Sequence, residues 1–142
     1  MTIPGIKKYH ANLSSRPTAA FALRPVSMID AFQSYVPFLL CGMLVIGGML
    51  NAVAPGPIRA QYASWGYPPG FHYVTAVCEL TSAGLLFFSG TRLIGAVLGA
   101  AVMGAATITL VRHREYKHML TPFVASAILI AVASSSYSAF HL

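Results

Sequence analysis

The chain has 142 residues, of which 56% are hydrophobic and 8% are charged, and its formal net charge is +6. Soluble domains carry about 25% charged residues, so the composition excludes an ordinary water-soluble globular protein, in line with the mean hydropathy of +0.68. Most basic residues flank apolar segments, where basic side chains meet lipid headgroups. We therefore expect a lipid bilayer, and not a nucleic acid, as the partner of these residues.

The first 33 residues form a tail that mixes basic residues with prolines. No apolar run of a signal peptide follows the first lysines, so we expect the first membrane helix to act as its own insertion signal. The tail, residues 1–33, is predicted to lie at the membrane interface or against a partner protein. The rest of the chain, residues 34–142, is predicted to form one transmembrane domain.

Four long apolar segments follow the tail, at residues 35–53, 70–88, 93–111 and 119–140. Each approaches or reaches the ~20 residues that a helix needs to cross ~30 Å of hydrocarbon. Helices satisfy their backbone polar groups internally, and the segments lack the alternating pattern of barrel strands. The sequence therefore predicts an all-α protein, a four-transmembrane-helix bundle with an extended N-terminal tail.

The connection between the first two apolar segments is the longest, and it combines a basic residue with aromatic ones: Arg59, Tyr62, Trp65 and Tyr67. This composition is typical of the headgroup layer of a membrane. We expect these four residues to lie at the interface, with part of the connection, residues 58–65, forming a short interfacial helix. Basic residues are nearly balanced between the two sides, so the positive-inside rule favours neither orientation.

Small residues are concentrated in the third apolar segment. Gly95 and Gly99 form a GxxxG pair, and Gly104 continues a ridge of small residues. Small residues let helix backbones approach closely in lipid. We interpret them as the packing seam inside the bundle, with a homodimer contact as the alternative.

The second apolar segment carries four polar residues on one face. His72, Thr75, Glu79 and Ser82 share an arc of about 80° on a helix, and the rest of that segment is largely apolar. Such a stripe is expected to face the interior of the bundle. We take these four residues as the candidate ligand-binding set and Glu79 as the candidate catalytic residue.

An acidic residue at the centre of a membrane helix costs several kcal/mol, so Glu79 needs compensation. Asn51, Thr107 and Thr109 are polar candidates, although each lies toward a helix end. Arg59 reaches Glu79 only if the first connection folds inward. Two roles stay open: a protonated Glu79 that donates a hydrogen bond and fixes the helix geometry, or a group that handles protons or binds a polar headgroup.

Other chemistry is sparse. The loop HREYKH, residues 113–118, contains two histidines and a glutamate, but without the spacing of an established metal site. We interpret it as a basic interfacial loop and expect no metal. The residues alone imply no cofactor.

The run from WGYPPG to LVRH, residues 65–113, resembles the DoxX-like family of small four-helix membrane proteins. The shared features are a Gly-Tyr-Pro turn, the step Glu79-Leu80, an arginine after a short turn, a third helix rich in small residues and a proline that opens the fourth. The resemblance extends over residues 35–140. It implies a four-helix bundle of a kind often encoded beside or assembled with oxidoreductases, and some relatives resemble membrane subunits of quinone-linked enzymes. A quinone is therefore the candidate ligand, and the family's glutamate corresponds to Glu79. Leu110 stands where the family often has a histidine, and His113 follows one turn later.

Three functions follow as hypotheses. The first is an accessory subunit, without catalytic activity of its own, that anchors or stabilises a larger, redox-linked membrane complex through residues 1–33. The second is a quinone- or lipid-binding component of a membrane oxidoreductase in which Glu79 handles protons. The third is a small transporter or channel, ranked last because four short helices leave little room for alternating access. The expected location is the bacterial inner (cytoplasmic) membrane.

Overall fold

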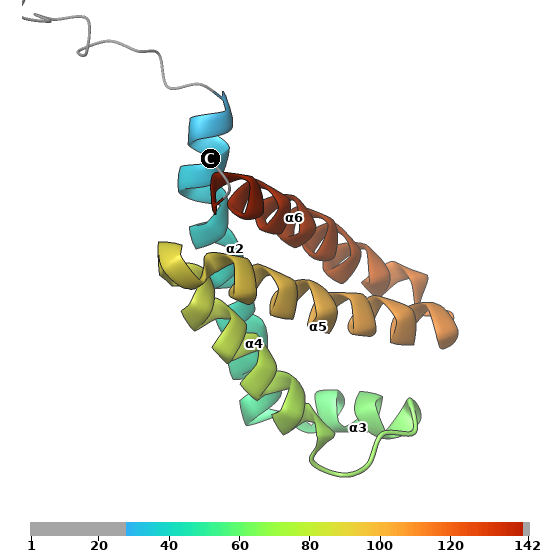
Figure 1. Cartoon of the computed structure of the whole chain (residues 1–142). Coiled ribbons are helices and arrows are strands. Elements are labelled where there is room, and N and C mark those ends of the chain that lie inside the picture. Colours follow the sequence, from blue (N-terminus) through green and yellow to red (C-terminus); the bar gives the residue numbers. More distant parts are fainter. Residues whose placement is uncertain (1–27, 141–142) are drawn as a thin grey trace, which may run out of the picture.

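The computed structural model describes residues 28–140, which contain helices and no strand (Figure 1). The predicted all-α fold class is therefore confirmed. The long helices are α2 (Met28–Val53), α4 (Phe71–Phe87), α5 (Arg92–Arg112) and α6 (Tyr116–Phe140). A short helix, α3 (Gly56–Ser64), joins α2 to α4, and a 3-10 turn, η1 (Ser89–Thr91), joins α4 to α5. Residues 1–27 of the predicted tail lie outside the described part, and residues 28–33 belong to α2.

The boundaries of α3 follow from local chemistry. The sequence Pro55-Gly56-Pro57 ends α2 and starts α3, since a proline fits the first helical turn, where no backbone donor is needed. After α3, Gly66 and Gly70 adopt φ values of 80° and 86°, which glycine tolerates best because it lacks a Cβ atom. The short helix that the sequence predicted at residues 58–65 is present as α3, which begins and ends slightly earlier.

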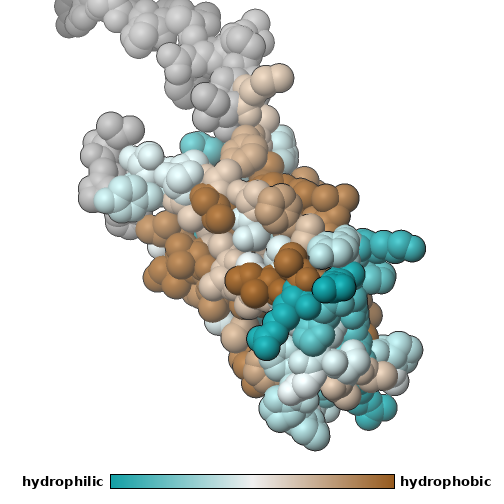
Figure 2. Space-filling view, turned by 90° about the vertical axis from the view of Figure 1, so that its right-hand side faces the viewer, coloured by the Kyte–Doolittle hydropathy of each residue, from teal (hydrophilic) through white to brown (hydrophobic). Residues whose placement is uncertain are grey.

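Three helical stretches are long and apolar enough to cross a membrane: Ala31–Val53, Ser89–Arg112 and Tyr116–Ser138. The second predicted segment is a shorter apolar helix, Phe71–Phe87. Large hydrophobic side chains are exposed along these helices. Figure 2 shows hydrophobic residues over much of the visible face and hydrophilic ones gathered toward one end. This surface is suited to a lipid bilayer.

The helices form two antiparallel pairs that diverge (Figure 1). In one pair α2 packs along α4, in the other α5 packs along α6, and α4 joins the two pairs by packing on α5. All four helices meet near the start of α5, which we call the core end. The pairs spread apart toward α3, which we call the α3 end.

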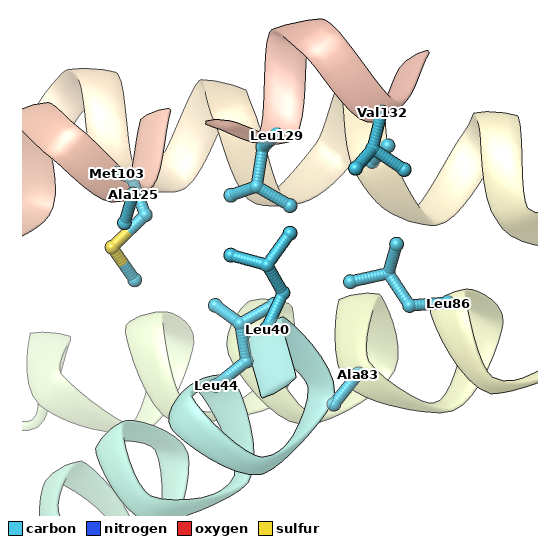
Figure 3. Packing of buried hydrophobic residues seen from close by; sticks show 9 residues of the cluster. Leu40, Leu44, Ala83, Leu86, Met103, Ala125, Leu129 and Val132 are labelled. Carbon is cyan, nitrogen blue, oxygen red and sulfur yellow. The ribbon is translucent and has the colours of Figure 1, made fainter. Parts of the chain in front are cut away.

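Leucines fill the core end (Figure 3). Leu44, Leu86 and Leu129 are fully buried and come from α2, α4 and α6. Figure 3 shows Leu129 and Leu40 pointing toward each other from α6 and α2. The hydrophobic core is therefore shared by both helix pairs.

The glycines of α5 lie close to neighbouring helices. A Cβ atom on Gly95 would lie 2.6 Å from the backbone nitrogen of Leu86 on α4. One on Gly99 would lie 2.6 Å from the Ser82 hydroxyl, and one on Gly104 would lie 3.8 Å from the Ser126 hydroxyl on α6. Gly95 and Gly99 are buried, so this pair is used in contacts within the chain and is not available to a second copy.

Candidate functional site

Glu79 is buried, with an exposed fraction of 5%, and it faces α2. Its Oε2 accepts a hydrogen bond from Asn51 Nδ2 at 2.9 Å. A Cβ atom on Gly47 would lie 3.2 Å from Glu79 Oε1, so the carboxyl group fits against the α2 backbone where glycine leaves room. Asn51 lies near the end of α2 but reaches Glu79, because helical side chains lean toward the N-terminus of their helix.

Asn51 is the centre of a small network that joins three helices. Its Oδ1 accepts a hydrogen bond from the Tyr62 hydroxyl on α3 at 3.2 Å, and its backbone oxygen lies 2.9 Å from His72 Nδ1 on α4. Since a carbonyl oxygen only accepts, we assign the proton to Nδ1 in this tautomer. Burial raises the pKa of the Tyr62 hydroxyl above its usual value, so this group stays a donor.

The other predicted partners of Glu79 bond elsewhere. Thr107 donates to the Met103 backbone oxygen at 2.8 Å, and Thr109 interacts with Ala105 and with the hydroxyl of Tyr67. Of the polar candidates from the sequence, only Asn51 forms a hydrogen bond with Glu79.

The four residues of the polar stripe face different neighbours. His72 and Glu79 both contact Asn51 on α2. Ser82, with no exposed surface, donates to the Gly95 backbone oxygen on α5 at 2.6 Å. Thr75 lies beside Tyr62 and lines a cavity next to α5. The stripe is therefore used in several separate helix contacts and does not line one shared channel.

The cavity next to Thr75 is an apolar groove of about 180 Å³ between α4 and α5, beneath α3. We call it the aromatic groove, because Tyr62, Trp65, Tyr67 and Phe71 form its walls. The rings of Tyr67 and Phe71 are stacked, with centroids 4.3 Å apart and an interplanar angle of 7°. Glu79 is not among its lining residues. Three of the four residues predicted at the interface thus line the groove, whereas Arg59 is exposed and lines a neighbouring cavity.

Small α5 side chains form the opposite wall, and hydroxyl groups lie at its edge. Ala105 and Ala106 line this side. The Tyr67 hydroxyl and Thr109 Oγ1 are 2.8 Å apart, which links the segment after α3 to α5. The groove therefore combines aromatic side chains, small α5 side chains and a few hydroxyl groups.

A glutamate between α5 and α6 holds α3 in place over this groove. Glu115 accepts hydrogen bonds from Trp65 Nε1 at 2.8 Å and from Gln61 Nε2 at 2.9 Å. These hydrogen bonds lower the pKa of Glu115 below its usual value, and the bond from Trp65 has the larger effect. We call residues 56–67 the α3 strap, since they connect the end of α2 to the start of α6 across the diverging pairs.

The sequence did not predict that Glu115 binds the α3 strap, since the loop at residues 113–118 was interpreted only as a basic interfacial loop. The signal for this contact in the sequence is Glu115, an acidic residue within a basic loop. In the same region, His113 is exposed at the end of α5, with its ring centroid 6.3 Å from that of Trp65, whereas Leu110 is buried. Within residues 28–140, no group of three His, Cys, Asp or Glu side chains is arranged to hold a metal ion.

A family model described as the DoxX-like family matches residues 36–132. The chain belongs to the DoxX-like family. The match includes the Asn51 network, the aromatic groove and the α3 strap. No curated protein and no solved structure matches the chain. Family membership and the apolar helices together indicate that this DoxX-like protein is a small integral membrane protein.

Proposed function

We propose that this DoxX-like protein binds the ring of a membrane-soluble quinone in the aromatic groove, as a component of a redox system in a bacterial inner membrane. The observation that carries the proposal is the groove itself, a slot of about 180 Å³ walled by four aromatic side chains. Flat rings pack well against aromatic side chains. Hydroxyl groups such as that of Thr75 are donors for quinone carbonyl oxygens.

The proposal includes a fourth membrane crossing by α4. Its 17 residues correspond to about 26 Å at 1.5 Å per residue, and about 17 residues is the lower end of the range for a spanning helix. α4 lies along α2, which is long enough to span, and it exposes Val74 and Val77. Four crossings place the groove beneath an interfacial helix, where a quinone that diffuses in the bilayer reaches it from the lipid.

In this proposal Glu79 is a positioning residue. Its carboxyl group lies outside the groove and holds the amide of Asn51, which accepts the hydrogen bond of Tyr62. Tyr62 in turn lines the groove. A side-chain amide does not readily pass a proton on. The two hydrogen bonds that link Tyr62 to Glu79 through Asn51 therefore fix the orientation of the Tyr62 side chain and do not serve as a proton path. The function proposed is binding, without a catalytic step of the protein's own.

The test uses Trp65, the only tryptophan of the chain, which lines the groove. Short-tailed benzoquinone and naphthoquinone analogues are titrated into the purified full-length protein in detergent, and Trp65 fluorescence is recorded. We expect saturable quenching. Ala106→Leu, which fills the groove, should weaken binding about tenfold, equivalent to about 1.4 kcal/mol.

Ala101→Leu is the matched control, because Ala101 is exposed on the same helix and does not line the groove. It should bind as the wild type does. Quenching that rises linearly without saturation, or that is equally strong in both variants, contradicts quinone binding in the groove.

A second candidate function is that of an accessory subunit that anchors a larger membrane complex. Its support is the start of α2, which projects past the other helices at the core end (Figure 1) and exposes Met28 and Tyr35. Purification in mild detergent should then recover a larger partner at a fixed ratio, and deletion of residues 1–27 should release it. Recovery of this chain without a partner contradicts the accessory role.

A further inference from the structure

We infer that the core end carries a second binding site, for the phosphate group of a phospholipid headgroup, built around Arg92. This site lies at the opposite end of the helices from the α3 strap, and it does not depend on the proposed quinone site. It is formed by the first residue of α5, the turn before it, and parts of α2 and α6.

The first observation is an unsatisfied arginine. Among the side chains that the structure describes, Arg92 Nε is the buried polar atom without a hydrogen-bond partner. Arg92 Nη1 donates to the Gln33 backbone oxygen at 3.5 Å, which is beyond the usual range for a good hydrogen bond. A buried donor without an acceptor costs free energy and calls for an explanation, such as a bound ion or ligand.

The second observation is the space beside this arginine. A cavity of about 190 Å³ is lined by Arg92 together with Ser89, Gly90, Ser135 and Ser136. A second cavity, of about 420 Å³, lies at Arg92, Gln33, Ser34 and Phe38. Arg92 therefore lines both cavities. Among the residues whose side chains the structure describes, the other polar lining comes from serines, glutamine and backbone, and no acidic side chain is included.

The ligand class follows from charge and depth. A planar guanidinium binds phosphate oxygens through paired hydrogen bonds. Arg92 lies at the end of the apolar stretch Ser89–Arg112, where the headgroups of a bilayer are found. Phe38, Phe87 and Phe88 are exposed nearby, and the Phe38 and Phe87 rings are 5.8 Å apart, so an apolar surface is present for acyl chains. These features favour a lipid phosphate over a free phosphate ion.

The serines add a preference among headgroups. Ser135 and Ser136 donate their hydroxyl hydrogens to the Val132 backbone oxygen, at 2.9 and 2.8 Å. Their oxygens then remain as acceptors. A headgroup with its own donors, such as glycerol or ethanolamine, complements them, whereas a choline headgroup has no such donor.

The experiment is native mass spectrometry of the full-length protein with added phospholipids. We expect one bound phosphatidylglycerol or phosphatidylethanolamine per chain and at least tenfold weaker retention of phosphatidylcholine. Arg92→Gln should lose this retention about tenfold. Arg114→Gln removes the same charge from an exposed residue outside the Arg92 cavities, and it should retain the lipid.

A second pair of variants leaves the charge unchanged. Ser135→Leu fills the cavity and should lose the lipid, whereas Ser134→Leu, at an exposed position outside the cavity lining, should keep it. This pair of serine variants tests the site if Arg92→Gln fails to fold. Equal lipid loss in Arg92→Gln and Arg114→Gln, or full retention in Ser135→Leu, overturns the site. Displacement of the lipid by millimolar inorganic phosphate overturns the assignment to a lipid.

Discussion

The two ends of the molecule are held together by different forces. At the core end, leucines from three helices are fully buried, and Gly95 brings α5 against the α4 backbone. At the α3 end, the helix pairs diverge, and hydrogen bonds of Asn51 and Glu115 connect them through α3. In lipid, apolar burial gives little drive for helices to associate. The helices are therefore held together by close packing at the core end and by directional hydrogen bonds at the α3 end.

This difference bears on function. A close-packed end resists change, because protein interiors have little free volume. An end joined by a few hydrogen bonds leaves room for a groove. The aromatic groove lies at this second end. Three substitution experiments examine the contrast, and the largest effect is expected at the core end.

The largest effect is expected for Gly95→Ala. The new Cβ atom would lie 2.6 Å from the Leu86 backbone nitrogen, so α4 and α5 must move apart. Overpacking of this kind costs about 1–3 kcal/mol or more. Thermal unfolding in detergent, followed by circular dichroism, should show a clearly lower midpoint. Gly104→Ala, where the nearest atom would be at 3.8 Å, should change little, and equal midpoints would remove the distinction between these two positions.

A smaller effect is expected at Glu79. Glu79→Leu removes the acceptor of Asn51 Nδ2. An unsatisfied buried donor costs about 1–3 kcal/mol, whereas hydrogen bonds between membrane helices contribute about 0.6 kcal/mol on average. We expect a loss of about 1 kcal/mol in unfolding free energy. Glu79→Gln keeps an acceptor and should lose less. If Gln destabilises as much as Leu, the carboxyl group does more than accept this hydrogen bond.

The smallest effect is expected at Glu115 and depends on pH. Because the pKa of Glu115 is lowered in the folded state, its stabilisation is complete above the ordinary carboxyl value of about 4.3. It is lost as the pH falls through the lowered value. Trp65, which donates to Glu115, should therefore change its emission on acidification below about pH 4. Glu115→Gln should abolish this transition and Glu79→Gln should keep it; an unchanged transition in Glu115→Gln contradicts the assignment.

Local patterns in the sequence were sufficient to predict the helices. Apolar length predicted the long helices, and aromatic and basic residues predicted α3 between Pro55 and Gly66. The GxxxG pair marked Gly95 and Gly99, which the structure places against α4. These features depend on neighbours in the chain, so they could be predicted without knowledge of the fold.

Contacts between distant residues could not be predicted in the same way. Gln61 and Trp65 meet Glu115 only because the helix pairs diverge and α3 spans them. The polar stripe was predicted to form one surface, but its arc on α4 is wide enough to face both α2 and α5. Glu79 therefore bonds to Asn51 on α2, whereas Ser82 bonds to Gly95 on α5. The tilt of helical side chains also brought Asn51 within reach of Glu79, although its position near a helix end argued against it.

The central claim is that a quinone ring lies in the aromatic groove at the α3 end. Photoaffinity labelling with an azidoquinone, followed by peptide mapping of the full-length protein, tests it most directly. We expect labels on residues 62–78 and 102–109, and we expect an excess of unlabelled quinone to prevent them. Labels on the lipid-facing sides of α2 and α6 that unlabelled quinone does not reduce would contradict the claim.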